Sequence, residues 1–140
     1  MKLLAVDFGM KRMGFAVGNS IIRTAAPIDP IVRKDDTQDI RYIEHLVDEY
    51  DISRVLIGYP LNMDGTKSGI TLKVEAFAEK LKEKIPGNIA VEFVDERLSS
   101  FEAEEMLKSH QQDYKKRKKV LDSISAMVLL RSYFDQSKNP

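Results

Sequence analysis

The sequence predicts an α/β protein with three layers, in which helices cover both faces of a central mixed five-stranded sheet. Short strands follow one another at the start of the chain, and beyond residue 35 helices alternate with strands. Strands joined by short turns pair antiparallel, whereas strands joined through a helix pair parallel, so the sheet is expected to be mixed. The chain has 140 residues, 43% of them hydrophobic, which suits a single domain over residues 1–140 with its own core.

Three strands are expected before the first helix. Lys2–Phe8 contains a continuous apolar run, typical of a strand buried on both faces. A turn at residues 9–13 leads into Gly14–Asn19, which is expected to form a hairpin with the first strand. Residues 21–32 are extended and apolar, but their two prolines restrict them to a sheet edge or a loop.

Four helices are predicted from apolar spacing and capping residues. Asp36 or Thr37 is expected to cap the first, and the second runs from about residue 71 to 85. A Ser-x-x-Glu capping box starts a third helix over residues 99–108, and the last covers about residues 118–134.

The remaining segments are two strands, two loops and a tail. Arg54–Gly58 and Ile89–Val94 are the expected strands. The loops cover residues 58–69, which are rich in turn-forming residues, and residues 109–117, which are polar and charged. Residues 136–140 are expected to be a frayed tail.

The formal net charge is zero, with 22 basic and 22 acidic residues, but the charges are unevenly distributed. Residues 35–51 contain seven acidic residues against one arginine, whereas residues 108–119 contain six basic residues against one aspartate. Such asymmetry predicts a local surface that faces a polyanion, and the alternative for the basic run is a solvated helix start or loop.

The composition excludes several classes of protein. The chain has no cysteine, which excludes a disulfide framework, a thiolate metal site and a cysteine nucleophile, and fits the cytoplasm. The longest apolar runs are four or five residues, far below the ~20 needed to span a bilayer. No membrane association is therefore expected.

Carboxylates near strand ends are the main candidates for chemistry. Asp7 lies near the end of the most apolar strand, where an unpaired carboxylate needs a metal, a cation or several N–H donors. Asp95 and Glu96 follow the strand that ends at Val94, and Asp122 lies among small residues in the last helix. Each also has a simpler explanation, respectively a turn cap, a polar strand exit and a surface residue balanced by a lysine.

Taken together, these acidic positions predict a metal site. A first strand, a later strand end and a C-terminal helix can bring carboxylates to one point above a sheet, and such a group is unfavourable unless divalent cations neutralise it. Oxygen ligands suit Mg²⁺ or Mn²⁺, and a site with two such ions can activate water and stabilise the leaving oxygen in phosphodiester cleavage.

Four ordered motifs along nearly the whole chain carry a family resemblance. They are Ala5-Val-Asp7-Phe-Gly9 with Gly14 following, Gly58-Tyr-Pro60-Leu-Asn-Met-Asp-Gly65-Thr, Asp95-Glu96-Arg97-Leu-Ser-Ser and Lys119-Val-Leu-Asp122-Ser-Ile-Ser-Ala126. With these motifs the chain resembles the YqgF-like family, also called the RuvX-like or Holliday-junction-resolvase-like family, of the ribonuclease-H-like superfamily. Where the family usually has a small or basic turn, this chain has Met10-Lys11-Arg12-Met13, whose two basic residues fit a phosphate contact. It departs from the family pattern at Ser125, where a second alanine is common.

The resemblance implies a ribonuclease-H-like fold and a divalent-metal-dependent nuclease; bacterial members are linked to 5′-end processing of precursor 16S ribosomal RNA. It implies Asp7, Glu96 (or Asp95) and Asp122 as the metal-binding catalytic acids, with nucleic acid and ribosomal particles as partners. Two alternatives stay open, the resolution of four-way DNA junctions and a non-catalytic RNA-binding role in ribosome assembly. The residues also leave open RNA or DNA as substrate, the endo- or exonucleolytic mode of cutting, and a monomer or a homodimer.

Basic residues are the expected contacts to the nucleic-acid backbone. The basic run immediately before Asp122 would hold the substrate while metal ions act on one phosphate. The loop at residues 58–69 is expected to be flexible and to contact substrate. The full predicted set is Lys11, Arg12, Lys67, Arg97, Lys115, Lys116, Arg117, Lys118 and Lys119.

Overall fold

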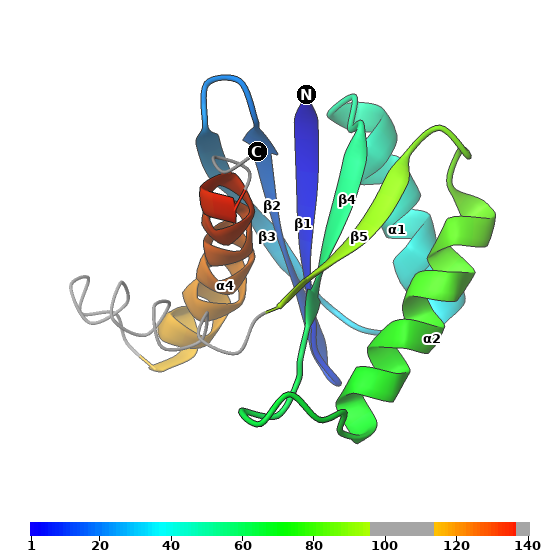
Figure 1. Cartoon of the computed structure of the whole chain (residues 1–140), viewed down its shortest axis with the longest axis vertical. Coiled ribbons are helices and arrows are strands. Elements are labelled where there is room, and N and C mark those ends of the chain that lie inside the picture. The colour runs from blue at the N-terminus through cyan, green and yellow to red at the C-terminus, as the bar shows by residue number, and fades with distance from the viewer. Residues whose placement is uncertain (96–113, 137–140) are drawn as a thin grey trace.

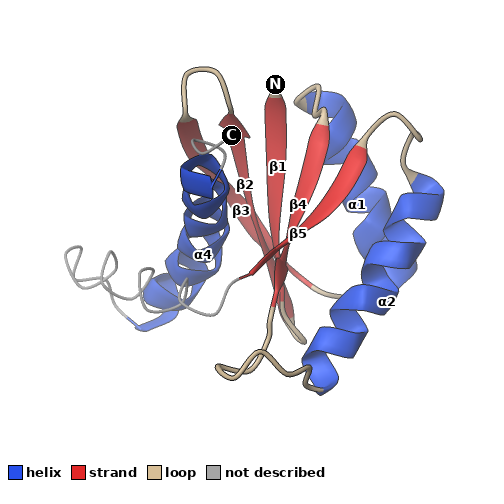
Figure 2. Cartoon of the chain, viewed as in Figure 1, coloured by secondary structure: helices blue, strands red, loops and turns tan. Residues whose placement is uncertain are grey.

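The computed structural model describes residues 1–95 and 114–136, and in the second segment the side chains of residues 124–135. Figures 1 and 2 show its helices and strands. In chain order they are β1 (Lys2–Phe8), β2 (Arg12–Asn19), β3 (Thr24–Val32), α1 (Asp36–Glu49), β4 (Arg54–Tyr59), α2 (Gly69–Lys84), β5 (Ala90–Asp95) and α4 (Tyr114–Gln136).

The strands form one mixed five-stranded sheet in the order β3-β2-β1-β4-β5, which confirms the predicted architecture. β1 pairs antiparallel with β2 and parallel with β4, and β5 continues the sheet parallel to β4. β1, β4 and β5 therefore end at the same end of the sheet. The amino-terminal part of α4 lies at that end too (Figure 1).

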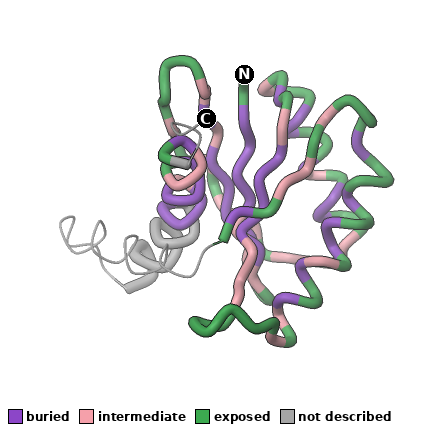
Figure 3. The backbone as a smooth tube through the Cα atoms, viewed as in Figure 1, coloured by how far each residue is buried: buried purple, intermediate pink, exposed green. Residues whose placement is uncertain are grey.

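Two separate cores lie on the two faces of the sheet. One face packs against α1 and α2, through Val6 of β1 and Ile57 of β4 with Ile43 and Phe77 of the helices. The other packs against α4, through a smaller cluster: Leu3, Ala5, Ala16, Leu56, Val94, Ala126, Leu129, Leu130 and Phe134. Figure 3 shows the central strands as the most continuously buried part of the chain. Alternate residues of β1 thus face different helices.

Two arginines fix the carboxyl-terminal part of α4 on the sheet. Arg54 of β4 donates a hydrogen bond from its guanidinium to the Tyr133 hydroxyl over 2.5 Å. Arg23, before β3, donates to the carbonyl oxygen of Phe134 over 3.2 Å. These contacts add polar anchors to the apolar packing of α4.

β3 lies at one edge of the sheet, as its prolines predict. Pro27 pairs opposite Ala16 of β2, and Pro30 lies between Ile28 and Ile31, where the pairing with β2 shifts register. A proline cannot donate to a strand ladder, so it is tolerated at an edge or next to a bulge.

The predicted starts of β2 and α1 are wrong by one or two residues. β2 begins at Arg12 rather than at Gly14, so the turn between β1 and β2 is two residues shorter than predicted. α1 is capped by Asp35, not by Asp36 or Thr37, because the Asp35 carboxylate accepts a hydrogen bond from the Gln38 amide over 2.8 Å.

The last helix also differs from its prediction. α4 begins at Tyr114, so residues 114–117 are helical and not part of a loop. The third predicted helix, residues 99–108, lies outside the described residues. Among residues 1–95 and 114–136, no helix has the length and apolar character needed to cross a bilayer.

Candidate functional site

Asp7 lies one residue before the end of β1, on the face that α4 covers. Leu3 and Ala5, two and four residues earlier on the strand, belong to the cluster under α4, so alternation places Asp7 on the same face. Its side chain is half-buried. The residue opposite Asp7 on β2 is Gly14, and on β4 Gly58 follows the residue paired with Val6. The residues beside Asp7 on the two neighbouring strands are therefore glycines, which add no side chain at these positions.

The turn after β1 depends on Gly9. A Cβ atom at this position would lie 2.5 Å from the Arg12 carbonyl oxygen, a backbone atom that cannot swing away. The glycine thus permits a close approach of the two backbones only two residues from Asp7. Lys11 is exposed in this turn and Arg12 is half-buried at the start of β2.

Arg33, which follows β3, holds this end of the molecule together. Its guanidinium donates to Asp36 over 2.5 Å, to Asp39 over 2.9 Å and to the Gly9 carbonyl oxygen over 3.4 Å. It also lies over the Phe8 ring, 4.2 Å from the ring centroid. Arg33 therefore ties the turn after Asp7 to the amino-terminal end of α1.

A second cation joins this network from α2. Lys80 donates to the other Asp36 carboxylate oxygen over 2.8 Å. The hydrogen bond from Lys80, together with the positive charges of Lys80 and Arg33, holds the pKa of Asp36 below its ordinary value of 3.8. Asp36 thus remains ionised and links α1 to α2.

Asp95 lies at the same end of the sheet as Asp7 but on the opposite face. Val94 packs in the cluster under α4, and its neighbour Asp95 is exposed at the end of β5, so strand alternation points it to the other side. Phe93, which shares that other side, stacks on Tyr59 with ring centroids 4.7 Å apart. Of the two predicted acids after Val94, Asp95 does not share the face of Asp7.

The remaining predicted acids and basic residues are only partly described. Asp122 lies in α4 one helical turn before Ala126, which packs in the cluster that contains Ala5. Its side chain lies outside the described residues, as do those of Lys115, Lys116, Arg117, Lys118 and Lys119, which α4 carries in its first two turns. Glu96 and Arg97 lie wholly outside them. Among the described side chains, no three His, Asp or Glu residues gather closely enough to hold a metal ion.

The loop between β4 and α2 is held by hydrogen bonds. Leu61 and Lys67 form an isolated antiparallel bridge, and the Asn62 side chain donates to the Thr66 hydroxyl over 2.9 Å. Thr71, fully buried, accepts from the Ser68 amide over 3.0 Å and donates to the Pro60 carbonyl oxygen over 2.5 Å. Both ends of the loop are thereby fixed.

Lys67, a predicted phosphate contact, is exposed but paired. Its ammonium group lies 2.9 Å from the Glu75 carboxylate, which also accepts a hydrogen bond from the Tyr59 hydroxyl over 2.9 Å. The hydrogen bond to Glu75 raises the pKa of Lys67, and the bonds from Lys67 and Tyr59 lower the pKa of Glu75. Lys11 is the more available cation near Asp7, because no described acid pairs with it.

Sequence reasoning missed Arg33, Asp39 and Glu75. Glu75 is bound by residues 8 and 16 positions earlier in the chain, whereas the contact of Arg33 with Asp39 is local. Arg33 stands between an edge strand and a helix start with acids three and six residues later, Asp36 and Asp39. That spacing suggests an arginine that folds back over the first turns of a helix.

The surroundings of Asp7 suit a hard divalent cation. The donor is a carboxylate oxygen, the ligand type that Mg²⁺ and Mn²⁺ prefer. Gly14, opposite Asp7, adds no side chain of its own that would compete with the water ligands that Mg²⁺ usually retains.

The sheet order, the helix on each face and the strand-end carboxylate define an α/β protein of the ribonuclease-H-like fold. Two solved structures share it: the fowlpox virus resolvase in complex with Holliday junction DNA and the T. thermophilus RuvC in complex with a junction substrate. The first has a TM-score of 0.59 at 18% identity and covers 98% of this chain and 99% of its own. The second has a TM-score of 0.55 at 9% identity, covering 97% and 96%.

Residues 1–136 match the model of the RuvX family, described as Holliday junction resolvase, and the chain belongs to that family. A relative from Escherichia coli O7:K1 is 42% identical over 135 residues, 96% of this chain and 96% of its own. That relative bears the name "Putative pre-16S rRNA nuclease".

Proposed function

We propose that this protein is a divalent-metal-dependent nuclease, a hydrolase that processes the 5′ end of precursor 16S ribosomal RNA during ribosome biogenesis. The observation that carries the proposal is the position of Asp7: near the end of the central strand, half-buried, on the face covered by the helix that contains Asp122. Family membership and the name of the E. coli relative support the substrate.

Asp7, Glu96 and Asp122 are the proposed metal-binding catalytic acids. Mg²⁺ or Mn²⁺, two ions in the proposed site, would supply Lewis acidity and an activated water at neutral pH. Glu96 is preferred to Asp95 as the ligand, because Asp95 lies on the sheet face opposite to Asp7.

The protein's own residues bind and orient the substrate. Lys11, exposed four residues after Asp7, is placed to contact a backbone phosphate. Arg33 donates a hydrogen bond to the Gly9 carbonyl oxygen. This bond fixes the turn that carries Lys11 relative to the end of β1. The basic residues of α4, with Arg12, Lys67 and Arg97, are proposed to hold flanking phosphates.

The proposed reaction is hydrolysis of a phosphodiester. The oxygen of water forms a bond to phosphorus in line with the leaving 3′ oxygen, the P–O3′ bond breaks, and the leaving oxygen takes up a proton. The products carry a 5′-phosphate and a 3′-hydroxyl. We propose that the reaction takes place in the cytoplasm and that precursor ribosomal particles are the partners. The oligomeric state, a monomer or a homodimer, stays a prediction.

The test compares matched RNA, single-stranded DNA and four-way DNA junctions in Mg²⁺ or Mn²⁺. Asp7→Asn and Asp122→Asn should keep the circular dichroism spectrum and lower RNA cleavage by on the order of 10²-fold or more. Asp29→Asn on β3 and Asp135→Asn on α4, both at exposed positions, are the matched controls and should retain activity. Full activity of Asp7→Asn would overturn the assignment.

Resolution of Holliday junctions is the second candidate, favoured by the family description and by the two resolvases of the same fold. Selective cutting of the junction with linear RNA untouched would favour it. Binding of precursor RNA without cleavage in Mn²⁺ would instead indicate a non-catalytic assembly factor.

A further inference from the structure

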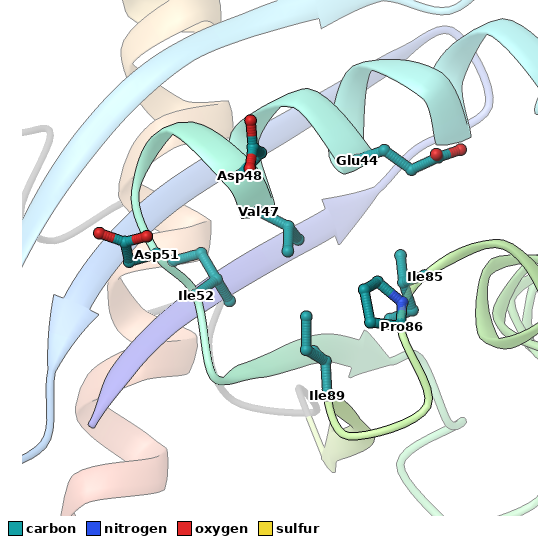
Figure 4. Close-up of a pocket in the computed structure, with 8 residues that line it drawn as sticks. All are labelled: Glu44, Val47, Asp48, Asp51, Ile52, Ile85, Pro86 and Ile89. Atoms are coloured by element: carbon teal, nitrogen blue, oxygen red, sulfur yellow. The ribbon is translucent and has the colours of Figure 1, made fainter.

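A cleft of about 350 Å³ lies between the end of α1 and the connection from α2 to β5. Ile52 lies two residues before β4 and Ile89 directly precedes β5, so the cleft lies at the end of the sheet opposite to Asp7. Figure 4 shows apolar side chains facing one another across it, with acidic side chains around them. The apolar residues are Val47, Ile52, Ile85, Pro86 and Ile89, and the acidic ones are Glu44, Asp48 and Asp51.

No described basic residue lines the cleft beside Asp48 and Asp51, whereas Glu44 also lines a neighbouring hollow with Arg41, Lys80 and Lys84. Glu44, Asp48 and Asp51 are exposed, and none forms a salt bridge within the part of the chain that the structure describes. The last turn of α1 contains no basic residue. Because the carboxyl-terminal end of a helix carries partial negative charge, acids here repel the helix end as well as one another. A bound cationic group would relieve this repulsion.

We propose that this cleft binds a lysine- and arginine-rich polypeptide segment that carries an aliphatic side chain. The aliphatic group would enter the apolar centre, and the cationic groups would pair with the carboxylates while their methylene stems cover Pro86 and Ile89. This surface is separate from the proposed nuclease site and does not depend on it.

Other ligands fit less well. Phosphates of nucleic acid would be repelled by three carboxylates at the rim. A single divalent ion needs converging oxygens, whereas the carboxylates of Glu44, Asp48 and Asp51 point in different directions (Figure 4). Basic groups spaced along a peptide can meet such separated acids one by one.

The test measures fluorescence anisotropy of the labelled peptide Lys-Arg-Leu-Arg-Lys titrated with the whole chain. The triple variant E44Q/D48N/D51N should bind about tenfold more weakly than the wild type. The control triple D29N/E79Q/D135N removes three acids from other exposed positions and should stay within about twofold. Replacing the peptide's leucine by serine should weaken binding to the wild type by about tenfold.

The triple variant should remain folded. Asp51 has a φ of 52°, a left-handed conformation that asparagine tolerates well. Removing negative charge from the end of α1 should raise the melting temperature by about 2–4 °C. Weaker binding by a more stable protein therefore cannot come from unfolding.

Three results would overturn the proposal: equal affinity of the two triple variants for the peptide, affinity independent of the leucine, or no saturable binding to the wild type. If the wild type binds no peptide but self-associates, and E44Q/D48N/D51N abolishes this self-association, the cleft would be assigned to a second copy of the chain instead.

Discussion

Arg33 donates from Nε to the Asp39 carboxylate over 2.9 Å, and the side chains of the two residues retain only 13% and 3% of their exposure. This ion pair is nearly buried, and its arginine also binds the Gly9 carbonyl. It therefore connects α1 with the turn that follows the proposed catalytic strand. Because each charge is removed from water, each depends on the other.

Removing one member of this pair should cost far more than removing an exposed acid nearby. Asp39→Ala leaves Arg33 without its most buried partner and should lower the free energy of unfolding by about 3 kcal/mol. Asp35→Ala removes the helix cap and an exposed hydrogen bond from the Gln38 side chain, and it should cost about 1 kcal/mol. Urea unfolding of both variants measures these losses. Equal losses in the free energy of unfolding would show that the buried ion pair contributes no more than the exposed helix cap.

Gly9 should not tolerate a side chain. Gly9→Ala places a Cβ atom 2.5 Å from the Arg12 carbonyl oxygen, so the backbone must shift, at a cost of about 1–3 kcal/mol, and RNA cleavage should fall with it. Gly69→Ala is the matched control, since nothing lies within 4 Å of its Cβ and alanine favours the first turn of α2. A stable, fully active Gly9→Ala variant would contradict the close approach.

The ionised Asp36 carboxylate should stabilise the folded protein, and this contribution should be lost at acidic pH. Its pKa is lowered in the folded state, so the folded protein holds the proton less tightly than the unfolded chain. The contribution is present above the ordinary value of 3.8 and is lost as the pH falls through the lower folded value. Urea unfolding between about pH 6 and about pH 3 should show a shallower decline for Asp36→Asn. Lys80→Gln should show an intermediate decline, because it removes the largest cause of the shift, and an unchanged slope in both variants would refute the linkage.

The Thr71 hydroxyl should be needed for the loop before α2. Thr71→Val keeps the shape but leaves the Pro60 carbonyl and the Ser68 amide without their partner, which should cost about 1–3 kcal/mol. Thr71→Ser keeps the hydroxyl and should cost less. Chemical denaturation compares the two, and a larger loss for Thr71→Ser than for Thr71→Val would indicate that the buried methyl group, not the hydrogen bonds, matters.

Local patterns were enough to predict the sheet. The continuous apolar run of β1 and the prolines of β3 have direct structural consequences, and both strands lie where these patterns place them. The helix cap was predicted wrongly because Asp35, Asp36 and Thr37 are all competent caps. The choice depends on Arg33 and Lys80, which bind Asp36 and leave Asp35 to cap the helix.

The candidate site was predictable only in part. Asp7 could be predicted as a candidate catalytic acid because it lies near the end of an apolar strand. The face occupied by Asp95 depends on the packing of Val94 under α4, which composition and motif do not reveal. The contact of Arg33 with Gly9 joins positions 24 residues apart, so it could come only from the folded chain.

The prolines of β3 also affect how the folded protein meets other strands. Edge strands with free N–H groups can recruit further strands and start intermolecular sheet growth. Pro27 and Pro30 have no backbone N–H, so they reduce the number of donors that β3 can offer. A crowded solution of this protein should therefore resist aggregation through β3, and the same two residues that set the sheet boundary limit sheet growth from that edge.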